Sequence, residues 1–260
     1  MGEWIDIDKL IVPGLDRVPS HFAKRFYSCE IRELIDVESW FVHEWFSDCK
    51  TWLDVVKKVI TEIKYPLDWA GRPTDFHYLQ AFRKYPAKCM RTYRVERDFW
   101  QKASETAFMG LGDCEDSSIL CGAGLYLKGY KFWIEVGVVY VKINATYKAL
   151  GGHAWVISEN DSRKWVLVET TLDKVPKRFP EVNPDAFRHY VGKLMYEAVI
   201  RFNKYNIQVA LIKPPTPPHE QGVIGSIVLE FITQVKEKTR KMEKKKLKVI
   251  REAWREAGLV

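Results

Sequence analysis

The chain has 260 residues, 47% apolar and 13% aromatic, which is enough for one large or two small domains with a sizeable core. This composition excludes a disordered or collagen-like chain. The longest nearly apolar run, 223–232, is about half as long as a membrane-spanning helix, and the N-terminus lacks a signal-peptide pattern. The five cysteines form no CxxC pair, which argues against a disulfide framework and a zinc ribbon. We therefore expect a cytoplasmic protein with reduced thiols and no membrane span.

The net charge of +7 is concentrated near the C-terminus. Residues 236–256 contain ten Lys or Arg and four Asp or Glu, a net charge of +6, so the rest of the chain carries only +1. This distribution argues against a binding surface that is basic throughout, and it predicts a basic tail.

A proline run at 214–218 divides the sequence into two parts. Such a run behaves as a stiff, extended spacer. We expect a body over residues 1–213 and a basic amphipathic helical tail over 219–260. The tail would pack on the body or on a second copy of the chain, or it would bind nucleic acid or another anionic surface. Apolar residues recur in it at helical steps: Ile224, Val228, Phe231, Val235, Met242, Val249 and Ala253.

The body changes from helical to strand-like patterns along the chain. Apolar residues at helical steps over 31–63 predict a helical N-terminal region, and a further helix is expected over 115–128 with Gly129 at its C-terminal end. β-branched and aromatic residues then predict three strands, at 132–141, 151–158 and 165–171. Helices followed by an antiparallel sheet predict an α+β fold.

The segment 110–118, Gly-Leu-Gly-Asp-Cys-Glu-Asp-Ser-Ser, contains the first candidate for chemistry. Its glycines permit a tight turn and Asp113 suits a helix N-cap, which would place Cys114 in the first helical turn. Free backbone N–H groups and the helix dipole stabilise a thiolate there. Glu115 and Asp116 would oppose a thiolate, and a buried structural cysteine is the alternative interpretation. The remaining cysteines have no neighbouring base in sequence: Cys29, Cys49, Cys89 and Cys121.

His153 is the candidate base, because it is the only histidine within a predicted strand. If the following hairpin has a three-residue loop at 160–162, His153 lies directly opposite Glu169. The carboxylate would then accept the Nδ1–H of the imidazole and leave Nε2 toward a thiol. Asp173 is the alternative acid.

A metal site could be drawn from Asp113, Glu115, Asp116 and His153. No HxxxH or HxH pair supports it, so we expect neither a metal nor a cofactor.

Several segments together resemble the transglutaminase-like cysteine protease superfamily of archaea and bacteria. The resemblance covers roughly residues 96–174 and follows the order Cys, His, acid. A papain-family enzyme would place its histidine more than a hundred residues after the cysteine. The segments are Phe99 to Thr106, Gly112 to Asp116, Gly129-Tyr130, Gly152 to Val156, and Val168 to Thr171.

This resemblance implies a papain-like or transglutaminase-like core, in which a Cys-bearing helix packs on an antiparallel sheet that carries the histidine and the acid. It implies a triad of Cys114, His153 and Glu169, although the family usually has Asp at the acid position. The oxyanion hole would use the backbone N–H of Cys114 and a second donor. Trp100 and Gln101 are the nearest candidates for that donor.

The expected activity is thiol-dependent acyl transfer on the amide bond of a protein or peptide. We favour hydrolysis over transfer to an amine, because no feature of the sequence indicates a shielded acceptor tunnel. A peptide N-glycanase is disfavoured because the paired CxxC zinc module of such enzymes is absent. The alternative is a non-catalytic interaction protein that uses the basic C-terminal helix to bind a partner.

Overall fold

The structure is a computed structural model that describes residues 3–6, 30–65, 100–211 and 243–260. Its helices are α2 (Glu30–Glu33), α3 (Trp40–Trp45), α4 (Trp52–Glu62), α7 (Ala103–Met109), α8 (Cys114–Leu127) and α10 (Glu243–Glu256). Its strands are β1 (Glu3–Asp6), β2 (Phe132–Ile143), β3 (Thr146–Glu159), β4 (Trp165–Val168), β5 (Arg188–Val191), β6 (Leu194–Phe202) and β7 (Ile207–Leu211). None of these helices has the length and apolarity needed to cross a membrane.

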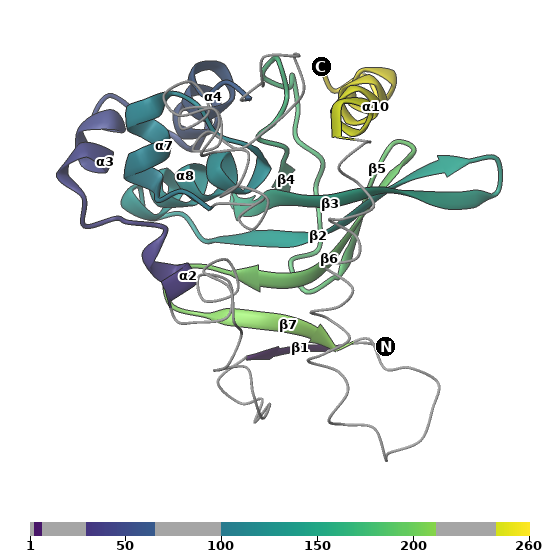
Figure 1. Ribbon diagram of the computed structural model, residues 1–260, viewed down its shortest axis with the longest axis horizontal. Helices are drawn as coiled ribbons and strands as arrows, with labels where there is room; N and C mark the ends of the chain where they lie inside the picture. The colour runs from purple at the N-terminus through teal and green to yellow at the C-terminus, as the bar shows by residue number, and fades with distance from the viewer. Residues whose placement is uncertain (1–2, 7–29, 66–99, 212–242) are drawn as a thin grey trace, which may run out of the picture.

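The strands form one antiparallel sheet in the order β1-β7-β6-β2-β3-β4, with β5 paired to β6. Figure 1 shows α3, α4, α7 and α8 gathered at one end of this sheet, beside β3 and β4. The predicted α+β class is therefore confirmed. Strands β5, β6 and β7, which follow the segments assigned from the sequence, extend the sheet on the far side of β2.

Helix α8 is the buried centre of the molecule and packs against β2 and β3. Its residues 114–125 are all buried, so the helix has no solvated face over most of its length. Close packing requires small residues: a Cβ at Gly124 would lie only 2.5 Å from the ring of Phe46. The helix ends as predicted, because Gly129 follows the C-cap Lys128 with a left-handed φ of 77°.

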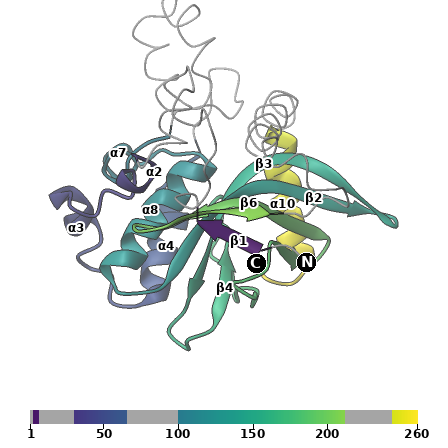
Figure 2. The same ribbon diagram turned by 90° about the horizontal axis from the view of Figure 1, so that it is seen from below.

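Helix α10 packs on the same sheet, although it follows the proline run in the sequence. Figures 1 and 2 show it beside β3, apart from the other helices. Ile250, Ala253 and Trp254 on this helix are buried, and its contacts include β3. The described part of the tail thus packs on the body. The spacer at 214–218 and the stripe from Ile224 to Met242 lie outside the described residues.

The hairpin between β3 and β4 differs from the predicted register. Val156 pairs with Val168 and Glu159 pairs with Trp165, so the loop spans the five residues 160–164. The Oδ1 atom of Asn160 accepts hydrogen bonds from two backbone N–H groups of this loop, at 2.9 and 3.1 Å. The prediction that His153 lies directly opposite Glu169 is therefore wrong, since the longer loop shifts β4 by two residues along β3.

Candidate active site

Cys114 is the first residue of α8, as the sequence predicted. Asp113 is the N-cap, and its backbone N–H donates to Oδ2 of Asp116 at 3.2 Å. This turn places Cys114 among the free N–H groups at the start of a 14-residue helix. Cys114 is buried, with 5% of its surface exposed.

The thiol of Cys114 donates to Oε2 of Glu115 at 3.0 Å. Glu115 is itself buried, and its pKa is raised to about 7 by burial and by the neighbouring charge of Asp116. At neutral pH this carboxyl therefore changes between its neutral and charged forms. A charged Glu115 opposes a thiolate, whereas a neutral one does not.

His153 and Glu169 form a buried pair on the sheet. Nε2 of His153 lies 3.1 Å from Oε1 and 2.9 Å from Oε2 of Glu169. The two side chains are fully shielded from solvent. Two of the three predicted triad residues are thus in direct contact, and the third begins the helix that packs against β3, the strand that carries His153.

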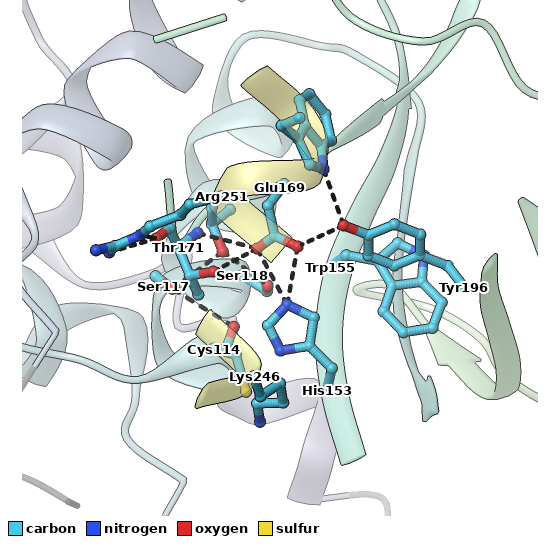
Figure 3. A network of polar contacts seen from close by, with 12 residues as sticks. Cys114, Ser117, Ser118, His153, Trp155, Glu169, Thr171, Tyr196, Lys246 and Arg251 are labelled. Carbon is cyan, nitrogen blue, oxygen red and sulfur yellow. Dashed lines mark hydrogen bonds and ion pairs between the residues drawn. The ribbon is translucent and has the colours of Figure 1, made fainter. Parts of the chain in front are cut away.

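The hydrogen-bond pattern fixes which nitrogen of His153 carries the proton in the neutral ring. An ionised carboxylate can only accept, so Nε2 must be the donor to Glu169. Nδ1 is then the basic nitrogen. It is buried and has no hydrogen-bond partner within the described part of the chain. Figure 3 shows the Nε2 edge of the ring toward Glu169 and the opposite edge toward Cys114. The sequence analysis expected the opposite arrangement, with Nδ1 donating to Glu169 and Nε2 facing the thiol.

Glu169 accepts further hydrogen bonds that hold its charge. Thr171 donates its backbone N–H at 3.1 Å and its hydroxyl at 2.6 Å to Oε1, and Tyr196 donates its hydroxyl to Oε2 at 3.0 Å. Burial alone would raise the pKa of Glu169. The nearby His153 and the donors of Thr171 outweigh burial, so this pKa lies below its ordinary value. The carboxylate is therefore ionised at neutral pH.

Hydroxyl groups connect the cysteine helix to the strand end that carries the acid. Thr170, next to Glu169 in sequence, lies 3.0 Å from the hydroxyl of Ser117 and 3.2 Å from that of Ser118. Both serines belong to the first turns of α8. These contacts fix the distance between the start of α8 and the carboxylate.

The remaining predicted site residues are the oxyanion-hole candidates Trp100 and Gln101 and the alternative acid Asp173. Both amide hydrogens of Gln101 are engaged, because Nε2 donates to Asp116 Oδ2 at 2.6 Å and to the carbonyl of Leu111 at 3.4 Å. Trp100 is buried, and its ring centroid lies 6.2 Å from that of Phe202. The role of Trp100 and Gln101 in an oxyanion hole stays a prediction. Asp173 lies toward the surface and pairs with Arg255 at 2.7 Å.

One group of potential metal ligands occurs in the described residues. Asp113, Cys114 and Glu115 each place one such atom within 4.8 Å of the others. Two of these residues are already linked by the thiol hydrogen bond. Asp116, which the sequence had included in a possible metal set, accepts from the backbone and side chain of Gln101 instead.

Three residues that support Glu169 received no such role in the sequence analysis: Thr171 and Tyr196, which donate to it, and Trp254, which donates to Tyr196. Trp254 of α10 donates its indole N–H to the hydroxyl of Tyr196 at 3.0 Å. Tyr196 and Trp254 are distant from Glu169 in sequence, and buried aromatic residues are common in any core. A sequence signal existed only for the hairpin that carries Tyr196, because Gly192 separates two β-rich runs.

Comparisons with known proteins give distant structural similarity only. No family model and no curated protein matches the chain. Among solved structures, the EGTA-treated form of LapG from Legionella pneumophila is 14% identical, with a TM-score of 0.35 over 88% of this chain and 99% of that one. The calcium-bound form is also 14% identical, with a TM-score of 0.34 over the same shares of the two chains.

Proposed function

We propose that this protein is a thiol-dependent enzyme that cleaves an amide bond by acyl transfer, on a transglutaminase-like core. The observation that carries the proposal is the buried His153–Glu169 pair, which lies on the sheet that the Cys114 helix packs against. A solvent-shielded carboxylate that fixes one nitrogen of an imidazole is the orienting part of a Cys-His-acid triad. The segments that resemble transglutaminase-like cysteine proteases contain all three residues.

The chemistry follows from the assigned proton positions. Nδ1 of His153 takes the thiol proton, and the sulfur of Cys114 attacks the amide carbonyl carbon. The C–N bond then breaks, and the same proton moves from Nδ1 to the leaving amine. The thioester that remains is attacked by water, which gives its proton to Nδ1. The C–S bond breaks, and the proton returns to the sulfur.

Glu169 supports these steps without exchanging a proton. Its negative charge stabilises the imidazolium that forms, and its two oxygens keep the ring oriented. Because its pKa is below the ordinary value, the carboxylate stays charged throughout the neutral range. We favour water over an amine as the second substrate and a protein or peptide as the first.

Selective alkylation tests the proposal. Iodoacetamide or a peptide vinyl sulfone is reacted with the full chain near neutral pH, and the modified cysteines are mapped by mass spectrometry. Cys114 should react in preference to the other cysteines, and His153→Gln should slow this reaction strongly. An unreactive Cys114, or a reaction that does not depend on His153, contradicts the proposal. That outcome would favour the alternative, a non-catalytic interaction protein on the same fold.

A further inference from the structure

The C-terminal helix α10 contacts three residues that adjoin the His153–Glu169 pair. The ammonium group of Lys246 donates a hydrogen bond at 2.7 Å to the carbonyl of Gly152, the residue directly before His153. Arg251 donates to the carbonyl of Thr171 at 3.0 and 2.7 Å. Trp254 reaches Tyr196 with its indole N–H. One helix therefore contacts the residue before the base and two residues that donate hydrogen bonds to the acid.

The third contact has a defined direction. An indole N–H can only donate, so the oxygen of Tyr196 accepts from Trp254 and directs its own hydrogen to Glu169. The pKa of Tyr196 is raised well above its ordinary value by burial and by the charge of Glu169, so the hydroxyl keeps this hydrogen. The result is a one-way chain of donors from Trp254 through Tyr196 to Glu169.

Burial makes this chain effective. Trp254, Tyr196 and Glu169 are each 0% exposed, so water does not replace a missing donor without repacking. The aromatic rings also pack around the base: the centroid of Tyr196 lies 6.4 Å from that of His153 and 5.1 Å from that of Trp155. Loss of one hydroxyl thus leaves the carboxylate with one donor fewer in a dry environment.

We propose that Tyr196 and Trp254 are positioning residues of the active site, and that α10 is a part of the catalytic unit. This proposal rests on the proposed function, since it concerns the acid of the same triad. Tyr196 fixes the rotamer and the charge of Glu169, and Trp254 acts through the hydroxyl of Tyr196. The position of α10 is then coupled to the reactivity of Cys114.

Two variants of the full chain test the proposal. Tyr196→Phe removes the hydroxyl and keeps the ring, whereas Trp254→Phe removes the indole N–H and keeps an aromatic side chain. The readout is the rate of alkylation of Cys114 by iodoacetamide as a function of pH. By analogy with partners of metal-ligating side chains, whose loss costs about 10–100-fold in activity, each variant should slow the reaction roughly 10-fold at neutral pH.

The pH profile separates positioning from a merely structural role. The donated hydroxyl hydrogen favours the charged form of Glu169, so its loss raises the pKa of this acid. The alkylation rate should fall at low pH, and we call this part of the pH profile its low-pH limb. The midpoint of this limb should rise by about one pH unit in the variants. The titratable groups in contact with Glu169 are His153 from β3 and Tyr196 from β6. On the elements packed nearby, Lys246 and Arg251 of α10 donate to the carbonyls of Gly152 and Thr171, and Cys114 and Glu115 begin α8 and bond to each other.

Trp52→Phe is the matched control. Trp52 also donates a buried indole N–H, to the hydroxyl of Ser158 at 2.7 Å, but it belongs to α4. Its backbone N–H donates to Tyr130 and Asp161, so its hydrogen bonds among the described residues lead away from Glu169. This variant should lose thermal stability and leave the low-pH limb in place. If Tyr196→Phe behaves in the same way as Trp52→Phe, the proposal is wrong.

A double variant tests the order of the chain. Because Trp254 acts through the hydroxyl of Tyr196, adding Trp254→Phe to Tyr196→Phe should move the limb no further. Additive shifts contradict this order. If Trp254→Phe does not fold, Tyr196→Phe still decides whether the hydroxyl matters. An unreactive Cys114 in the wild-type protein would overturn the proposed function itself. If Cys114 reacts but Tyr196→Phe leaves the low-pH limb at its wild-type position, only the present proposal is overturned.

Discussion

Glu169 lies diagonally across from His153, not directly opposite it. The pairing of Val156 with Val168 places Glu169, the residue after the last position of β4, level with Trp155. Side chains on diagonal positions of neighbouring strands start about 7–8 Å apart at the backbone, compared with about 5 Å for directly facing ones. The side chain of Glu is one methylene longer than that of Asp, which lengthens its reach along this diagonal, and Oε2 lies 2.9 Å from Nε2 of His153.

The first prediction concerns this carboxylate. Glu169→Gln keeps the length and removes the charge, so thiol-dependent turnover should fall by on the order of 10²–10⁴ while the fold survives. Glu169→Asp keeps the charge but is too short for the diagonal, so it should also lose activity. Asp173→Asn is the control and should retain near-full activity, because Asp173 pairs with Arg255. Loss of activity in Asp173→Asn together with an active Glu169→Gln would reverse the assignment of the acid.

The second prediction concerns the selectivity among thiols. Burial raises the pKa of Cys49 to about 11, with the charge of Asp48 contributing, and raises that of Cys121 to about 12. At pH 8 about one in a thousand Cys49 thiols or fewer is ionised, so both should resist alkylation in the folded protein. The measurement is peptide mapping after brief treatment with iodoacetamide, in a Cys29→Ser, Cys89→Ser background. Equal labelling of Cys49 and Cys114 would contradict it.

The local features of the site could be predicted from the sequence because local residues determine them. The Gly-x-Gly-Asp-Cys segment specifies a turn and an N-cap, which places Cys114 at a helix start whatever surrounds it. The strand that carries His153 was recognised by its β-branched and aromatic residues, and the helix end was recognised from Gly129.

The sequence patterns did not predict how separate segments pair and pack against one another. Loop length sets the hairpin register, and the loop between Glu159 and Trp165 closes through the side chain of Asn160 and a left-handed Arg163 with φ of 60°. No periodicity reveals such a closure. The contacts of Tyr196 and Trp254 with the acid arise from packing between segments far apart in the chain, and the sequence interpretation of the tail included none of them.

The third prediction concerns the pH dependence of stability. Glu115 has a folded-state pKa of about 7, above its ordinary value of 4.5, so the folded state binds the proton more tightly than the unfolded state. Its contribution to stability is full below about pH 4.5 and is lost as the pH rises through 7. The loss is on the order of 3 kcal/mol. Glu115→Gln should flatten the fall in unfolding free energy between pH 5 and pH 8, measured by urea denaturation. Parallel profiles for the two proteins would show that Glu115 is not the group responsible.

The fourth prediction concerns the turn before Cys114. A Cβ at Gly112 would lie 2.7 Å from Cβ of Asp116 and 2.9 Å from Cγ2 of Thr106. Gly112→Ala should therefore displace Asp116, whose carboxylate holds the N–H of Asp113 at the start of α8. Overpacking of this kind costs about 1–3 kcal/mol of stability. It should also slow alkylation of Cys114, because the first turn of the helix shifts.

The control for that change is another glycine with a different constraint. Gly129 has a left-handed φ of 77°, but a Cβ there would meet no atom within 4 Å. Gly129→Ala should cost about 1 kcal/mol in backbone strain and leave the alkylation rate of Cys114 unchanged, since it lies at the opposite end of α8. Thermal unfolding and alkylation rates measured on both variants separate the two effects. If Gly112→Ala loses stability but keeps the full rate, the turn supports the fold without setting the position of the thiol.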